Sequence, residues 1–413
     1  MRLSKLNTLF FMLISTFAAV SCGEDRTYEY IEKTEKNQWI YSSMKDVYLW
    51  ADEIKEPERN AFFGSESKFF SSLLSKNDKV SYFTDSVSTG SYGLTVALMR
   101  DPLSIKPSRY YALVLFVESD SPADVAGIGR GTWISGINGK ALTSTSEKLL
   151  LSGDGIELTT SYIDYNDENE EYFWVESDTL ALPASMAIDS KAIYADTIYN
   201  VRGNKVGYVV CKNLNGSSFA TEIQEIMLGF ATADVMDIIV DLRYCNEGTL
   251  DNAVTMASIL APASLVGTPF AILKGGNAGA DITYNYTEQY VNINDKRLFF
   301  IIGNATKGFA ELLVASVNAS RGMHEVVVVG AKSIGANMLT ERFDSPYGFS
   351  INPAVALIYS SDGEMLSQTG IEPDYPLDEL EEVKRIYKLG DEQEYILRSI
   401  EYLIVYGELP AGM

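Results

Sequence analysis

The stretch Val206-Gly207-Tyr208-Val209-Val210 is the first of four short apolar runs that decide the fold class of this chain. The other three are Ile238–Val240, Leu298–Ile302 and Val326–Val329, and between the four lie helical stretches at 219–230, 253–260 and 310–317. Apolar strands that alternate with helices are typical of a parallel sheet covered by helices. We therefore predict an α/β domain with a largely parallel sheet over residues 181–413.

A C-terminal helix is expected to close this domain. Asp391, with Glu394 three residues later, resembles a helix-starting capping pair. The apolar positions that follow at helical spacing are Ile396, Leu397, Ile400 and Leu403.

Two further modules are predicted ahead of the α/β domain. Over residues 22–88 we expect a helical module, because apolar residues recur on one helix face from Tyr28 to Trp50 and again from Phe69. Over residues 89–180 we expect a compact β domain, because β-rich runs such as 111–117 and 133–137 are separated by Gly, Pro and Asp. The acidic run Asp164–Glu171 is interpreted as a solvated hairpin loop. The first helix face consists of Ile40, Met44, Val47 and Tyr48, and the second of Phe69, Phe70, Leu73 and Leu74.

The N-terminus indicates export. Arg2 and Lys5 precede an apolar run, residues 9–20, that is too short to span a bilayer as a mature helix. Residues 1–21 are therefore interpreted as a signal peptide. The run ends in Ala-Val-Ser-Cys22, which resembles a bacterial lipobox with Cys22 acylated, and acyl chains supply membrane affinity. We expect a protein anchored in the cell envelope, at the outer membrane with a periplasmic or surface face. A plain signal peptide with an incidental cysteine is the alternative.

The composition excludes several partners. Residues 1–21 carry two cations and no anion, so their removal changes the formal charge from −23 to −25. Such an acidic protein repels nucleic acid and anionic lipid. Cys211 and Cys245 lack metal-ligand spacing, so we expect no metal and no cofactor. Two buried thiols are expected, with one disulfide between them as the alternative.

The β region carries a first resemblance. The segment 121–128, Ser-Pro-Ala-Asp-Val-Ala-Gly-Ile, and the segment 131–139 after it resemble the second half of a PDZ domain. PDZ domains bind an extended C-terminal peptide as an added strand and hold its carboxylate with backbone N–H groups. The resemblance implies that Ser91-Tyr92-Gly93-Leu94 is this loop, with Gly93 and Leu94 as peptide-binding residues. In the alternative reading these glycines only form β-turns.

Three motifs in the α/β region resemble the C-terminal processing (tail-specific) serine peptidases, in that family's order. They are Gly207–Val210, Asp241–Tyr244 and Gly370–Asp374. The N-terminal segment from Trp39 to Trp50 resembles Bacteroides-type lipoprotein members. The resemblance covers nearly the whole chain after the signal peptide. It implies nucleophilic catalysis by a serine that a desolvated lysine activates.

The positions that correspond to the catalytic residues hold no reactive group. The family's serine lies three residues before a glutamate, here Glu311, so the nucleophile position falls on Gly308. The lysine follows a Gly-x-x-x-x-Gly pattern and corresponds to Ala336, and a supporting polar residue corresponds to Thr340. The oxyanion positions are Gly248 and Phe309, and Glu247 replaces a glycine beside them, where a carboxylate opposes negative charge.

Neighbouring residues are weak substitutes. Thr306 and Ser333 offer hydroxyls and Lys307 and Lys332 offer amines, but the family anchors fix the register on both sides. We interpret the two lysines as solvent-exposed cations. His324 is the chain's sole histidine, and it precedes a strand in a turn that is expected to face water.

The expected function is that of a pseudopeptidase which binds extended peptides or protein C-termini. One alternative is an active serine endopeptidase with a non-standard site. Another is a structural envelope component that partners an active homologue.

Overall fold

The structure is a computed structural model that describes residues 27–85, 90–105, 108–275, 281–321 and 326–410. The predicted signal peptide, Cys22 and His324 lie outside the described residues. The chain divides into two compact units. The first combines the described residues up to Asp85 with the distant segment Arg342–Pro353, and the second comprises the rest.

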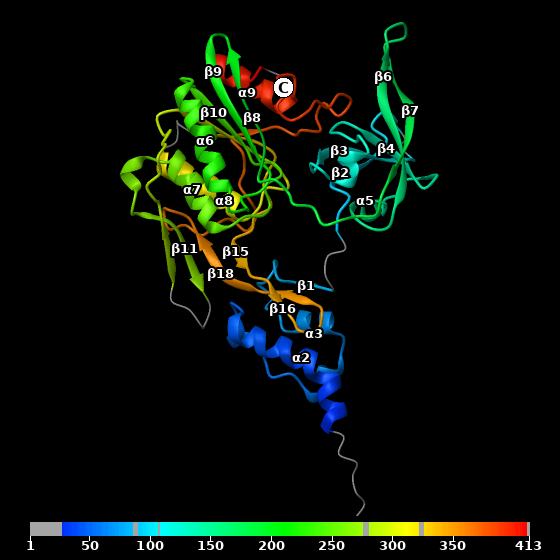
Figure 1. The fold of residues 1–413 in the computed structure, drawn as a ribbon, viewed down its shortest axis with the longest axis vertical. Coiled ribbons are helices and arrows are strands. Elements are labelled where there is room, and N and C mark those ends of the chain that lie inside the picture. The colour runs from blue at the N-terminus through cyan, green and yellow to red at the C-terminus, as the bar shows by residue number, and fades with distance from the viewer. Residues whose placement is uncertain (1–26, 86–89, 106–107, 276–280, 322–325, 411–413) are drawn as a thin grey trace, which may run out of the picture. The chain divides into compact units, whose positions relative to one another are not determined.

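The first unit packs helices against a small sheet (Figure 1). Ile40, Met44 and Tyr48 lie on one side of the chain at the end of the first helix and are fully or almost fully buried. Phe83 stacks on Phe349 of the distant segment at 5.1 Å between ring centroids. The elements are α2 (Thr27–Val47), η1 (Ala51–Glu53), η2 (Arg59–Phe63), α3 (Glu66–Ser72) and the antiparallel strands β1 (Tyr82–Thr84), β17 (Ser350–Asn352) and β16 (Phe343–Asp344).

The second unit begins with an antiparallel β domain. Its core is formed by buried apolar residues such as Val114, Ile134 and Leu158. The last two strands form a hairpin whose loop covers residues 167–170 only. The predicted loop, Asp164–Glu171, was too long, because Asp164 and Glu171 at its ends lie in the paired strands. The sheet order is β2 (Leu94–Arg100), β3 (Tyr110–Val117), β4 (Trp133–Ile137), β6 (Ile156–Asn166), β7 (Glu171–Leu182), with β5 (Lys140–Ala141) on β4 and helices α4 (Pro122–Val125) and α5 (Glu147–Leu151).

The α/β part of the second unit contains a six-stranded sheet. Five neighbouring strands run parallel, and one edge strand runs antiparallel to its neighbour. The order is β19 (Tyr375–Pro376), β14 (Val326–Gly330), β13 (Arg297–Ile302), β10 (Asp237–Asp241), β9 (Asn204–Cys211), β8 (Ile193–Val201).

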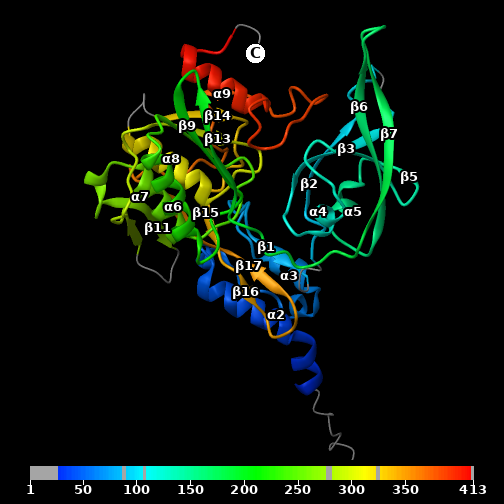
Figure 2. The same cartoon turned by 45° about the horizontal axis from the view of Figure 1, so that its top comes forward.

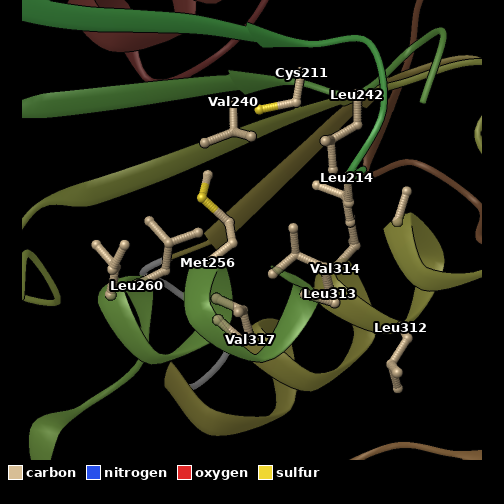
Figure 3. Close-up of a cluster of buried hydrophobic side chains, with 14 of the residues drawn as sticks. Cys211, Leu214, Val240, Leu242, Met256, Leu260, Leu312, Leu313, Val314 and Val317 are labelled. Atoms are coloured by element: carbon tan, nitrogen blue, oxygen red, sulfur yellow. The ribbon is translucent and has the colours of Figure 1, made fainter. Parts of the chain in front are cut away.

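Both faces of this sheet are covered, which explains the continuous apolar runs of its strands. On one face, Val240 and its neighbours pack against α6 (Phe219–Thr232), α7 (Leu250–Leu260) and α8 (Phe309–Arg321). Figure 3 shows part of this core, with Val240 and Leu242 on the sheet side and Met256 and Val317 on the helix side. On the other face, Ile239 and its neighbours pack against α9 (Tyr395–Tyr406). Figures 1 and 2 show the three helices and α9 on opposite sides of the strands.

A second, antiparallel sheet of four strands completes the α/β part. Its order is β12 (Ile282–Asn285), β11 (Pro269–Gly275), β18 (Ala354–Tyr359), β15 (Met338–Thr340), and the short helix η3 (Ala263–Leu265) precedes β11. Within the described ranges, no helix has the length and apolarity needed to cross a membrane.

The start of α9 corrects one prediction. The helix begins at Tyr395 rather than near Asp391, and Glu394 is its N-cap, with a carboxylate that accepts the Leu397 N–H at 2.9 Å. Glu394 is 2% exposed and pairs with Arg243 at 2.7 Å. The predicted capping pair was therefore placed three residues too early, because a buried ion pair fixes the glutamate at the helix start.

Candidate functional site

The candidate site lies at the carboxyl ends of four parallel strands, where open α/β sheets place their ligands. The segments that follow β9, β10, β13 and β14 are joined by backbone hydrogen bonds. The Lys307 N–H donates to the Cys245 carbonyl at 3.0 Å, the Ile334 N–H to the Thr306 carbonyl at 3.1 Å, and the Leu214 N–H to the Glu247 carbonyl at 2.9 Å. These bonds hold the loops that carry the predicted catalytic positions as one cluster.

The centre of the cluster is the carboxylate of Glu311, in the first turn of α8. The residue is 2% exposed, and its two oxygens accept four hydrogen bonds. The Gly308 N–H donates at 2.9 Å, the Gly335 N–H at 2.7 Å, the Ala336 N–H at 2.8 Å, and the fourth donor is the Ser333 hydroxyl. Glu311 therefore joins the start of α8 to the loop after β14.

The two positions that correspond to nucleophile and base are thus brought together. Gly308 and Ala336 both donate their backbone N–H to the same oxygen of Glu311. Neither side chain can attack a carbonyl or accept a proton. Gly308 has a φ of +63°, in the left-handed region, where a side chain is strained even though the space around a Cβ is open.

The neighbouring hydroxyls serve the structure. Thr306 is fully buried; its hydroxyl donates to the Leu242 carbonyl and accepts the Gly303 N–H, each at 2.8 Å. Ser333 is 5% exposed and accepts the Ile371 N–H at 2.7 Å while it donates to Glu311. Both hydroxyls are occupied in the loop framework, so neither is placed to act as a nucleophile.

The neighbouring cations and thiols differ in exposure and in their partners. Lys332 has 43% of its side chain exposed and pairs with Glu372, in agreement with the predicted exposed cation. Lys307 was also predicted to be an exposed cation, but it is half-buried, and it has no ionic partner among the described residues. Cys211 and Cys245 are free and buried, and burial raises the pKa of the Cys245 thiol to about 12. A thiol so far from ionisation is inert.

The oxyanion positions differ from one another. Gly248 lies in an isolated parallel bridge with Leu214, and a Cβ at Gly248 would lie 2.6 Å from the Leu214 Cβ. Close backbone approach therefore accounts for this glycine. The N–H groups of Gly248 and Phe309 have no acceptor among the described residues. The exposed Glu247 side chain approaches the Asn215 amide at 3.4 Å, at the same turn as Gly248.

The remaining predicted site residues lie elsewhere. Thr340 ends β15 in the antiparallel sheet, where it pairs with Ala354. In the β domain, the Gly93 N–H donates to the Ser91 hydroxyl at 2.9 Å, and the Tyr92 N–H to the Leu151 carbonyl at 3.1 Å. Two N–H groups expected for a peptide carboxylate are thus already bonded. Leu94 opens β2, which pairs only with β3 among the described residues.

A buried ion cluster next to the site has no clear signal in the sequence. Arg243 is 2% exposed and contacts Asp241 at 2.8 Å and Glu394 at 2.7 Å. Arg130, from the β domain, pairs with Glu379 at 2.9 Å. Burial alone would raise the pKa of the Glu394 carboxyl, but the Arg243 guanidinium holds it below its usual value. The residues of this ion cluster come from four segments far apart in the chain, so no local sequence pattern reveals the cluster.

Arg130 also binds the β domain to the segment that follows the sheet. Its guanidinium donates to the Leu115 carbonyl at 2.7 Å, the Tyr244 hydroxyl at 2.6 Å and the Tyr387 carbonyl at 2.9 Å. Tyr244 immediately precedes the turn of Glu247 and Gly248. The β domain is therefore fastened beside one of the candidate-site loops. The described residues contain no group of three or more His, Cys, Asp or Glu side chains placed to hold a metal.

The sheet, its helices and the loops around Glu311 define a peptidase-type α/β protein with an attached β domain. Residues 205–377 match the model of peptidase family S41, and residues 35–82 match the model of the peptidase S41 N-terminal domain. The chain belongs to this family of C-terminal processing peptidases.

Solved structures agree with this assignment. A Bacteroides fragilis protein assigned to the S41 proteases is 25% identical, with a TM-score of 0.77 over 89% of this chain and 97% of that one. The photosystem II D1 C-terminal processing protease is 17% identical, with a TM-score of 0.53 over 88% and 99%. Mature CPAF is 10% identical, with a TM-score of 0.52 over 92% and 99%. The last two likenesses concern the fold alone. A comparison with proteins of curated function finds no match.

Proposed function

We propose that this protein is a pseudopeptidase of family S41 that binds extended peptides or protein C-termini and does not cleave them. The observation that carries the proposal is the pair of positions around Glu311. Gly308 and Ala336 stand where a nucleophile and a base are expected, and both contribute only a backbone N–H to a buried carboxylate. A peptidase of this type needs a serine hydroxyl and a neutral amine within reach of each other.

Three further observations support the absence of cleavage. The hydroxyls of Thr306 and Ser333 are each engaged as donor and acceptor within the loops. The Cys245 thiol is kept protonated by burial. Glu247 adds a negative charge at the turn where an oxyanion would need hydrogen-bond donors.

Peptide binding is proposed for the free edge of β2 in the β domain. An extended peptide that adds to a sheet edge gains backbone hydrogen bonds, and side-chain contacts give the specificity. Leu98 is partly buried against the apolar core on the side of α5. The neighbouring Met99 packs on the opposite face of the sheet. These two neighbouring residues, on opposite faces of the same strand, provide a matched pair of positions for testing peptide binding at the β2 edge.

The alternative is an active serine-type endopeptidase that acts on protein C-terminal regions. The D1 processing protease is named for such an activity, but an identity of 17% shows a likeness of fold only. In one version of this alternative, the alignment with the family motifs is shifted and Thr306 or Ser333 is the nucleophile. This version can be tested directly.

The catalytic test uses the purified chain without its signal peptide. We expect no labelling by a fluorophosphonate probe and no cleavage of an unstructured peptide with an apolar C-terminus. Labelling that disappears in Thr306→Val or Ser333→Ala would overturn the pseudopeptidase assignment. In the same assay, Gly308→Ser with Ala336→Lys is expected to restore little activity, because Glu247 remains beside the oxyanion position. The double variant is compared with and without Glu247→Gly, and full activity of the double variant alone would contradict this reasoning.

The binding test uses a peptide array with free and amidated C-termini. Leu98→Glu is expected to abolish binding of the retained peptides, and Met99→Glu to preserve it. Equal binding by both variants, or equal binding of free and amidated peptides, would contradict recognition of C-termini at this edge.

We further propose that Cys22 carries a lipid anchor in the cell envelope. The lipobox-like sequence at 19–22 supports this. Cys22→Ser is expected to move the protein from the membrane to the soluble fraction and to remove labelling by a radioactive fatty acid. Unchanged fractionation would contradict it.

A further inference from the structure

The hairpin of β6 and β7 extends beyond the sheet of the β domain. The neighbouring strand β4 covers β6 only as far as Ser161, which lies opposite Trp133. Beyond that point, residues 162–166 of β6 and 171–175 of β7 pair only with each other among the described residues. Figures 1 and 2 show this part as a long two-stranded ribbon. Neither edge of this ribbon pairs with a third strand among the described residues.

The two faces of the ribbon have different surroundings. Residues opposite each other on paired strands share a face, so Tyr165 and Tyr172 lie together, with ring centroids 4.8 Å apart. Toward the base of this face, Trp174 stacks on Tyr111 at 4.0 Å. Lys384 places its ammonium 4.3 Å from the centre of the Tyr172 ring. The protein's own side chains thus contact this face, although Tyr165 and Tyr172 remain 42% and 44% exposed.

The opposite face, which we call the open face, consists of Tyr162, Asp164, Glu171 and Phe173 with their neighbours. The register places Asp164 directly opposite Phe173, and Tyr162 opposite Val175. Tyr162 is 48% exposed and Phe173 is 43% exposed. Two large aromatic side chains are thus about half exposed to solvent beside carboxylates. Exposed aromatic side chains do not improve solubility, so their presence here indicates a binding surface.

The charge of the ribbon indicates which kind of partner it can bind. Residues 149–190 contain no lysine and no arginine, although the chain as a whole has 33. From Glu157 to Asp178 there are eight acidic residues, namely Glu157, Asp164, Asp167, Glu168, Glu170, Glu171, Glu176 and Asp178. The ribbon therefore combines aromatic side chains with carboxylates and contributes no cation of its own.

We propose that the open face binds an extended segment of a partner protein that is rich in lysine or arginine. A cation over an aromatic ring, flanked by carboxylates, is held by the ring and by the charge together. The other face of the same ribbon already binds an ammonium in this way, because Lys384 lies over Tyr172. Anionic lipid, nucleic acid and a second copy of this chain, with a net charge of −23, are repelled. The proposal does not depend on the fate of the catalytic positions.

The test measures fluorescence anisotropy with a labelled, C-terminally amidated decapeptide of alternating lysine and serine, at 50 mM salt. Amidation separates this binding from recognition of C-termini at β2. The double variant Tyr162→Ser/Phe173→Ser is expected to weaken binding about tenfold, and Asp164→Asn/Glu171→Gln several-fold. The matched controls are Tyr290→Ser, at another exposed aromatic residue, and Glu222→Gln/Glu225→Gln on the exposed side of α6.

The controls are expected to bind within about twofold of the unaltered protein, because two neutralised charges far from a bound peptide are largely screened. A glutamate–serine decapeptide is expected not to bind. Three results would overturn the proposal: no binding of the lysine peptide, unchanged binding by Tyr162→Ser/Phe173→Ser, or an equal loss in the α6 control. The last would show attraction by the overall acidity of the chain. Far-UV circular dichroism checks that the ribbon variants remain folded.

Discussion

Replacing Glu311 is expected to destabilise the protein strongly although it removes no catalytic group. Glu311→Ala leaves four donors without their acceptor. Gly308 and Gly335 are half-buried, so water can satisfy their N–H groups, whereas the Ser333 hydroxyl and the Ala336 N–H are buried. An unsatisfied buried donor costs about 1–3 kcal/mol, so the loss in the free energy of unfolding is about 4 kcal/mol. Glu311→Gln, which keeps the shape but turns an amide toward N–H donors, is expected to lose about 2 kcal/mol.

The measurement is urea unfolding of the purified chain, followed by circular dichroism and by proteolysis. Glu222→Ala is the matched control, because Glu222 lies in the first turn of α6 and is exposed. The control is expected to change the unfolding free energy by less than about 0.5 kcal/mol. If Glu311→Ala falls within 0.5 kcal/mol of this control, the carboxylate does not hold the loops together, and the reasoning fails.

Three other changes test separate features. Gly308→Ala is expected to lower the free energy of unfolding by about 1 kcal/mol, because residue 308 has a positive φ. Gly229→Ala, in the interior of α6 with equally open space, is expected to raise it by about 0.5–1 kcal/mol. Thermal unfolding midpoints that move in the same direction for both variants would contradict this. Burial raises the pKa of Glu401 to about 7, so its folded state favours the proton and stability falls as pH rises from 4.5 to 7. After allowance for its partial exposure, Glu401→Gln should therefore gain about 1 kcal/mol at pH 8 and little at pH 4, and a pH-independent difference in unfolding midpoints would refute it. Arg130→Ala is expected to lower the free energy of unfolding by about 3–5 kcal/mol, because it leaves Glu379 without this partner. Arg130→Lys should not restore stability, because an ammonium cannot reach the same four acceptors. Full stability of the lysine variant in thermal unfolding would refute this.

The elements with local signals could be predicted from the sequence. The alternation of apolar runs from Val206 to Val329 located four strands of the central sheet and the three helices on one face, because each strand is buried on both sides. The helix face with Ile40 and Met44 could also be predicted, because these apolar residues are four positions apart, and the structure buries both fully.

What the sequence did not reveal depends on contacts between distant segments. Nothing near Phe349 indicates that residues 342–353 join the N-terminal helices, where this ring stacks on Phe83. Arg130 and Glu379 are 249 positions apart, and each alone resembles a surface charge. At the candidate site, the residue types at 308 and 336 were evident from the motifs. Their shared bond to one oxygen of Glu311 required the structure.

If the proposed function holds, the backbone at Gly308 affects how a serine–lysine pair could be introduced into this chain. Gly308→Ser alone would place a serine in a left-handed backbone conformation with no base beside it. This substitution would therefore add strain without reactivity. A lysine at 336 by itself would enter a loop whose backbone already binds Glu311. Each single substitution therefore leaves the serine–lysine pair incomplete, and the one at Gly308 also carries the strain of a positive φ. If the proposed function holds, a serine–lysine pair could therefore be regained only by two substitutions together with relief of the backbone strain at Gly308.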